Sequence, residues 1–176
     1  RIDSYKDAVY PRPNGDPIVK PKDIDQQTLY RIDINWRNAL QATTMSYDEM
    51  LPGYNNYYLA SCPNGALNVK SYKGITLNNI YNGINVHYYE HKGELKHDYR
   101  VAPGANYKNI QLEVNGAEVK INNNGSLFLI TPLGKVEEGA PIVFQNGQQL
   151  NAKWVLNNNV LSFDIENYNP NYELLH

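Results

Sequence analysis

Apolar and polar residues alternate in short runs along most of the chain after residue 27, and a period of two is typical of half-buried β-strands. In the first run, Leu29 to Trp36, four aromatic or aliphatic side chains fall on one face and mostly polar ones on the other. Similar runs predict strands at 67–72, 75–80, 84–90, 94–101, 110–114, 118–121, 127–131, 142–145, 149–156 and 160–165. The chain is therefore predicted to be mainly β.

Turn signals separate these runs at intervals of about 8–12 residues, which favours antiparallel pairing. The clearest hairpin joins residues 84–90 to 94–101 through a tight Lys92-Gly93 turn. Asn-Gly, the strongest short hairpin signal, recurs at Asn115 and Asn146, and again at Asn124. We predict an antiparallel β-sandwich of about ten to twelve strands, with Asn-Gly hairpins and little helix.

Two segments depart from this pattern. Four prolines fall within eleven residues of the stretch 1–27, which predicts a proline-rich leader or edge segment ahead of a single antiparallel β domain at 28–176. Ala39 to Met50 is the one plausible helical segment, although its threonines and serine favour a strand equally well. Gly53 to Tyr58 is aromatic and resembles a turn.

The composition and charge argue against several classes of function. The 176 residues include 25 Asn and 15 Tyr but only 3 Phe, and the net charge is −2. This balance, without a Lys/Arg cluster, argues against nucleic-acid binding. No apolar run approaches the ~20 residues of a membrane span, so we expect no membrane insertion. Cys62 is the only cysteine, which excludes an internal disulfide.

The histidines of the predicted hairpin are the strongest candidates for metal chemistry. If residues 91–93 form a three-residue loop, His87 faces His97 across the hairpin, as two ligands of a zinc site would. Asp98 would then point to the opposite face from His97, because side chains alternate along a strand. We therefore interpret both histidines as solvent-facing and predict no metal site.

Other catalytic arrangements are no better supported. Glu137 and Glu138, like Asp164 and Glu166, are neighbours in the sequence, whereas a glycosidase needs two carboxylates held across a cleft. The chain has no nucleophile elbow, zinc-protease motif or phosphate loop. We predict no catalytic residues, no cofactor and no enzymatic activity.

Tyrosines crowd the middle of the chain and have two interpretations. With so few phenylalanines, tyrosine has to fill much of the core, as Trp36 and Trp154 in alternating runs are also expected to do. Exposed tyrosines would instead stack on a glycan or anchor a protein partner. The candidate ligand-binding residues are Tyr54, Tyr57, Tyr58, Tyr88 and Tyr89.

The second half of the chain also carries an ordered series of short motifs. They are Asn82-Gly83-Ile84-Asn85, the strand 86–89, Gly93, His97-Asp98-Tyr99, Ala102-Pro103-Gly104-Ala105, Gly116-Ala117, Gly125-Ser126-Leu127 and 141–145, with Asn56-Tyr57-Tyr58 upstream. Their order and spacing over residues 45–170 resemble the N-terminal β-domain of secreted Bacteroidota surface proteins that carry SBBP repeats or gliding-motility-type sorting domains. The usual Asn-Lys-Gly-Gln-type N-terminal segment of that family is replaced here by the proline-rich leader.

The resemblance implies a secreted protein on the extracellular cell surface, exported by the type IX route, with no known catalytic residues. Its expected partners are a glycan or a surface protein, together with other domains of the parent chain. We expect a non-enzymatic structural or interaction module that supports adhesion or assembly. The alternative is a carbohydrate-binding module that uses exposed tyrosines.

Overall fold

The structure is a computed structural model that describes residues 28–41, 44–59 and 61–176, so the predicted leader at 1–27 lies outside the described residues. Within the described part, the chain forms sixteen strands and one helical turn, the 3-10 helix η1 (Tyr107–Asn109). The strands are β1 (Asp33–Trp36), β2 (Thr44–Tyr47), β3 (Asn55–Leu59), β4 (Cys62–Val69), β5 (Gly74–Tyr81), β6 (Ile84–His91), β7 (Glu94–Val101), β8 (Leu112–Asn115), β9 (Glu118–Ile121), β10 (Leu127–Thr131), β11 (Gly134–Glu138), β12 (Val143–Gln145), β13 (Gln148–Leu150), β14 (Ala152–Asn157), β15 (Val160–Ile165) and β16 (Leu174–Leu175).

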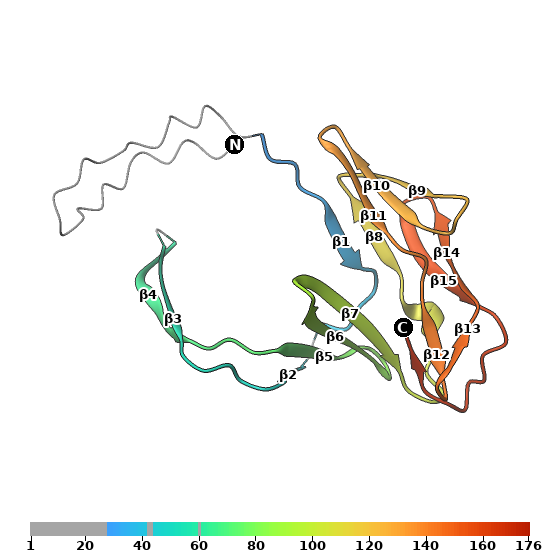
Figure 1. Ribbon diagram of the computed structural model, residues 1–176, viewed down its shortest axis with the longest axis horizontal. Helices are drawn as coiled ribbons and strands as arrows, with labels where there is room; N and C mark the ends of the chain where they lie inside the picture. Colours follow the sequence, from blue (N-terminus) through green and yellow to red (C-terminus); the bar gives the residue numbers. More distant parts are fainter. Residues whose placement is uncertain (1–27, 42–43, 60) are drawn as a thin grey trace.

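The strands form an antiparallel sandwich, as predicted. One layer is a seven-stranded sheet in the order β13-β12-β16-β7-β6-β5-β2, and facing it is a four-stranded sheet, β1-β8-β15-β14. A three-stranded sheet, β11-β10-β9, continues the second layer, since β9 contacts β14. The remaining pair, β3 and β4, lies apart from the sandwich in Figure 1, and we call this hairpin the arm.

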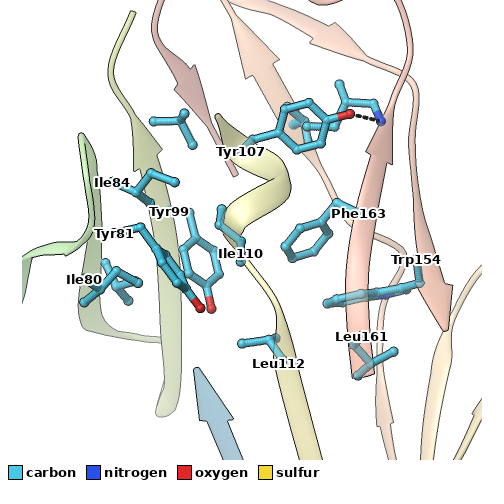
Figure 2. Packing of buried hydrophobic residues seen from close by; sticks show 14 of the residues in the cluster. Ile80, Tyr81, Ile84, Tyr99, Tyr107, Ile110, Leu112, Trp154, Leu161 and Phe163 are labelled. Carbon is cyan, nitrogen blue, oxygen red and sulfur yellow. Dashed lines mark hydrogen bonds between the residues drawn. The ribbon is translucent and has the colours of Figure 1, made fainter. Parts of the chain in front are cut away.

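The core lies between the two large sheets and is rich in aromatic rings (Figure 2). Tyr99 from β7 meets Phe163 from β15 with ring centroids 6.1 Å apart, and the Trp154 ring packs at a tilt against Phe163 with centroids 4.8 Å apart. Tyr81 and Tyr107 are also buried, so tyrosine does replace phenylalanine in this core. Trp154 belongs to the core as predicted, whereas Trp36 is half-buried and packs against its edge.

The β6–β7 hairpin has the predicted strands but a different register from the one considered for a metal pair. Its loop contains only two residues, Lys92 and Gly93, both with positive φ, as a tight hairpin turn requires. His87 consequently pairs with Asp98, and His97 pairs with Tyr88. The three-residue loop, with His87 opposite His97, was therefore wrong.

Several other local predictions are corrected. The segment 39–50 forms no helix among its described residues and contains β2, while 53–58 leads into β3 rather than a turn alone. The run 149–156 is divided between β13 and β14, which belong to different sheets. The chain crosses between layers at Asn151, a corner that alternation does not reveal. With β11 and β16 also unpredicted, the strand count exceeds ten to twelve.

Candidate functional site

A cleft of about 690 Å³ lies between the two layers, alongside the β6–β7 hairpin. One wall is the inner face of that hairpin, with Tyr88 and His97, and another is β1. The segment from β10 to residue 142 encloses it further. We call this space the aromatic cleft, defined by the rings of Trp36, Tyr88, His97, Tyr99, Trp154 and His176.

Alternation along β6 explains why the cleft is aromatic. Ile84, Val86 and Tyr88 share one face of the strand; the first two are fully buried, while Tyr88 is only half-buried. The apolar face of β6 is therefore covered by the second layer at Ile84 and Val86 and lines the cleft at Tyr88. Ile34 of β1 faces the same space and is 53% exposed, so the apolar face predicted for 29–36 is not buried along its whole length.

The polar tips of two rings are already occupied by structural hydrogen bonds. Trp36 Nε1 donates to Tyr99 Oη at 2.8 Å, and Trp154 Nε1 donates to the Gly139 carbonyl at 2.8 Å. Both indole donors are therefore held within the protein. The cleft presents ring faces and aliphatic side chains rather than free donors from these groups.

The two imidazoles of the cleft are held neutral near pH 7. Burial lowers the pKa of His176 to about 4, with a smaller lowering from the charge of His97. Partial burial of the ring also lowers the pKa of His97, against a weaker opposing effect of Glu138 and Asp98, although His97 as a whole is an exposed residue. Neither ring nitrogen of His176 has a hydrogen-bond partner within the described part of the chain.

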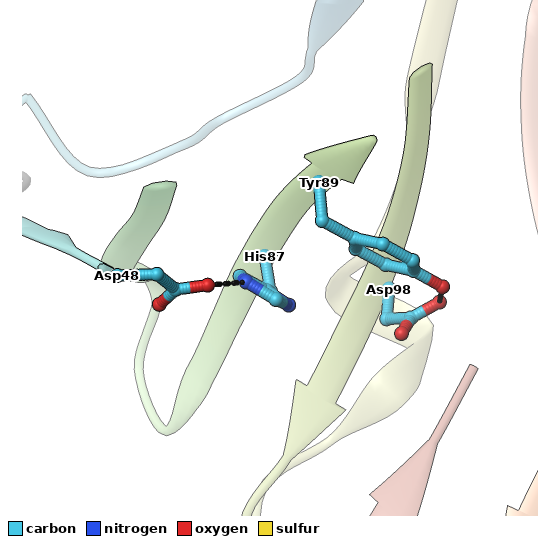
Figure 3. A network of polar contacts seen from close by, with 4 residues as sticks. All are labelled: Asp48, His87, Tyr89 and Asp98. Carbon is cyan, nitrogen blue, oxygen red and sulfur yellow. Dashed lines mark hydrogen bonds and ion pairs between the residues drawn. The ribbon is translucent and has the colours of Figure 1, made fainter. Parts of the chain in front are cut away.

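A separate polar network lies on the other face of the same sheet (Figure 3). His87 Nε2 lies 2.8 Å from the Asp48 carboxylate, and the His87 ring stacks on Tyr89 with centroids 5.1 Å apart. Tyr89 Oη donates to Asp98 Oδ1 at 3.3 Å. The network joins the end of β2 to β6 and β7. Across the described ranges, no group of three or more His, Cys, Asp or Glu is placed to hold a metal ion.

Gly74 gives this network its space, and Gly74→Ala is expected to displace the Asp48–His87 pair. A Cβ on Gly74 would overlap the Asp48 carboxylate and lie 2.7 Å from His87 Nε2 and 3.0 Å from the Tyr88 carbonyl oxygen. The neighbouring side chains and backbone would have to shift to relieve this overlap. The shift should lower the free energy of unfolding by about 1–3 kcal/mol, measured by urea denaturation.

The matched control is Gly139→Ala, which adds the same methyl group at a position where nothing lies within 4 Å. Equal stability of the two variants would show that the Asp48–His87 pair is not confined by Gly74.

The five candidate tyrosines do not form one surface. Tyr54, Tyr57 and Tyr58 lie on or beside the arm and are 59%, 48% and 74% exposed, so of the two interpretations of the tyrosines the core does not apply to these three. Tyr88 lines the aromatic cleft, and Tyr89 lies on the opposite face in the polar network. Sequence reasoning missed the cleft itself. In the two-residue-loop register of the hairpin, Tyr88, His97 and Tyr99 share one face. This run of rings is the feature of the sequence that could have indicated the cleft.

Comparisons with known proteins identify a family but no activity. Residues 8–175 match the model of a family described as a domain of unknown function (DUF7948). No curated protein and no solved structure matches the chain. Among the described residues there is no helix with the length and apolar character needed to cross a membrane.

Proposed function

The chain belongs to the DUF7948 family, and we propose that it is a non-enzymatic interaction module that binds an apolar group of its partner in the aromatic cleft. The observation that carries this proposal is the cleft itself, about 690 Å³ in volume and walled by aromatic rings. Pockets of this size, mostly apolar with a few polar groups, are typical of ligand sites.

The rim of the cleft favours a protein partner. Leu95, Val136 and Ile142 surround the opening and are 76%, 56% and 57% exposed. Apolar side chains gathered around an opening are characteristic of interaction surfaces rather than of ordinary solvated ones. An aromatic or aliphatic side chain of the partner would enter the cleft while the rim covers its surroundings.

The polar groups of the cleft support binding rather than chemistry. The indole donors are engaged in structural bonds, and the imidazole of His176 is desolvated. From the resemblance to secreted Bacteroidota surface proteins, we propose that the module lies outside the cell. There it would support adhesion or assembly next to other domains of its parent chain.

Binding of the fluorescent probe 1-anilinonaphthalene-8-sulfonate to the folded protein tests the cleft. Ile142→Glu adds a negative charge at the rim and should weaken probe binding by at least about tenfold, because the carboxylate repels the sulfonate of the probe and would have to be desolvated. Leu133→Glu is the matched control, since Leu133 is also 57% exposed but does not line the cleft. Equal probe binding by both variants, or none by the unaltered protein, would reject the cleft as the binding site.

The exposed tyrosines favour a carbohydrate-binding module as a second candidate. Tyr58 is the most exposed of them, at 74%, and a ring that is free on one face can stack on a sugar. Tyr57 and Tyr58 point to opposite faces of β3, so they do not form one flat platform. A glycan array with Tyr57→Ala and Tyr58→Ala tests this alternative. Selective binding that is lost in a folded variant would support it, and no binding would exclude it.

A further inference from the structure

The arm lacks the charged side chains that usually keep an isolated hairpin from pairing with other strands. From Met50 to Val69, twenty consecutive residues contain no Asp, Glu, Lys or Arg. β3 and β4 pair only with each other, so each has an outer edge without a neighbouring strand among the described residues. Natural proteins usually protect such edges with charges. In the described part of the arm, the protection consists of Pro63 and two register shifts in the β3–β4 ladder.

The arm also leaves its apolar side chains in solvent. Tyr57 and Tyr58 of β3 are largely exposed, as is Leu67 of β4 at 52%. The buried core begins only at Ile80, so no arm residue contributes to it. A two-stranded hairpin without a packed face is marginally stable by itself. The arm therefore has both free edges and free apolar area to offer.

The same chain has an uncovered apolar surface on the seven-stranded sheet. Met45 pairs with Leu77, Leu77 with Val86, and Val86 with Tyr99, so all four side chains lie on the inner face of that sheet. Tyr99 and Val86 are buried beneath the second layer, whereas Met45 at the far end is 54% exposed.

The next row of cross-strand pairs on this inner face is also apolar and also ends in an exposed side chain on β2. Tyr47 pairs with Ile75, which in turn pairs with Tyr88, and Tyr47 is 51% exposed. The apolar inner face thus extends under β5 and β2, beyond the point where the second layer ends at β1. We call the part formed by Met45, Tyr47, Ile75 and Leu77 the open face.

The boundary of the second layer is itself a free strand edge. Arg37 N donates to the Gln111 carbonyl at 2.9 Å, which marks that pair as a hydrogen-bonded one. Because such pairs alternate in an antiparallel ladder, the backbone groups of Ile34 and Trp36 are directed away from β8. β1 is the last strand of its sheet, so within the described residues this edge is unpaired. A strand added there would lie over the open face.

We propose that the arm of one copy of this chain adds to the β1 edge of a second copy and covers its open face. Both halves of the contact are on the same polypeptide. One is an uncharged hairpin with free edges, and the other is a free strand edge beside a partly exposed apolar face. Figure 1 shows the arm lying apart from β1 of its own copy, so the contact forms between copies. Two copies that exchange arms form a closed pair, as in domain swapping.

Sedimentation equilibrium of the full chain across a concentration series tests this contact, with a reductant present because Cys62 lies in the arm. We expect a reversible dimer. Leu67→Lys charges the arm and Met45→Lys charges the open face, and each should weaken self-association by at least about tenfold. Leu133→Lys, an equally exposed position outside both surfaces, should dimerise as the unaltered protein does.

Mixing the two weakened variants separates this proposal from other pairings. Leu67→Lys retains an intact open face and Met45→Lys an intact arm, so the mixture should associate more strongly than either variant alone. If Met45→Lys alone dimerises as well as the unaltered protein, the arms pair with each other and the proposal is wrong. A chain that stays monomeric at all concentrations overturns it as well.

Discussion

Tyr99→Ala is expected to lower the free energy of unfolding by about 3–5 kcal/mol, as large-to-small changes at buried aromatic positions do. Tyr99 is 1% exposed and joins the layers of the sandwich. Its ring packs edge-on against Phe163 and lies 5.9 Å from His176, and its hydroxyl accepts from Trp36. The alanine variant leaves a cavity and also removes the acceptor of the Trp36 indole.

Tyr99→Phe separates these two effects. It keeps the ring but leaves Trp36 Nε1 without its partner, which should cost about 1–3 kcal/mol. Tyr89→Phe is the matched control, because its hydroxyl makes one long, part-buried bond of 3.3 Å to Asp98, and its cost should stay below about 0.5 kcal/mol. Urea unfolding followed by tryptophan fluorescence measures all three variants. If the two phenylalanine variants lose the same stability, the Trp36–Tyr99 bond does not hold β1 to the sandwich.

The strands were predictable where one face of a strand is buried, because burial produces alternation. The predicted runs 118–121, 127–131 and 160–165 coincide with β9, β10 and β15. β11 was missed because all five of its residues are exposed, so neither face selects apolar side chains. β16 has only two residues and pairs with β7 and β12 far away in the sequence, which no local pattern reveals.

The candidate site was less predictable, because alternation shows which side chains share a face but not which parts of that face are covered. Met45 and Val86 lie on one face of one sheet, yet only Val86 is buried. The aromatic cleft depends on contacts between distant segments, such as Trp36 with Tyr99, 63 residues apart. The arm tyrosines show the same limit of the sequence, because tyrosines in short strands look like core residues. Among the described residues, however, no second layer covers the arm.

His176 is expected to make the protein less stable as the pH falls from 7 to 5. Its pKa in the folded protein is about 4, compared with about 6.5 in the unfolded chain. Between these values the unfolded state binds more protons, so stability is lost as the pH falls through 6.5 toward 4 and levels off below. The expected loss between pH 7 and pH 5 is about 2 kcal/mol from this residue.

His176→Phe tests the assignment, because it keeps a ring against Phe163 and Trp154 but cannot bind a proton. Between pH 7 and pH 5, its free energy of unfolding should fall by about 2 kcal/mol less than that of the unaltered protein. The remaining dependence should fall in the same direction, since burial also lowers the pKa of His97. His91→Gln, at the exposed end of β6, should retain the full dependence. If His176→Phe retains it too, the ring of His176 is solvated, and the aromatic cleft is wetter and more polar than its lining of tryptophan, tyrosine and phenylalanine contacts indicates.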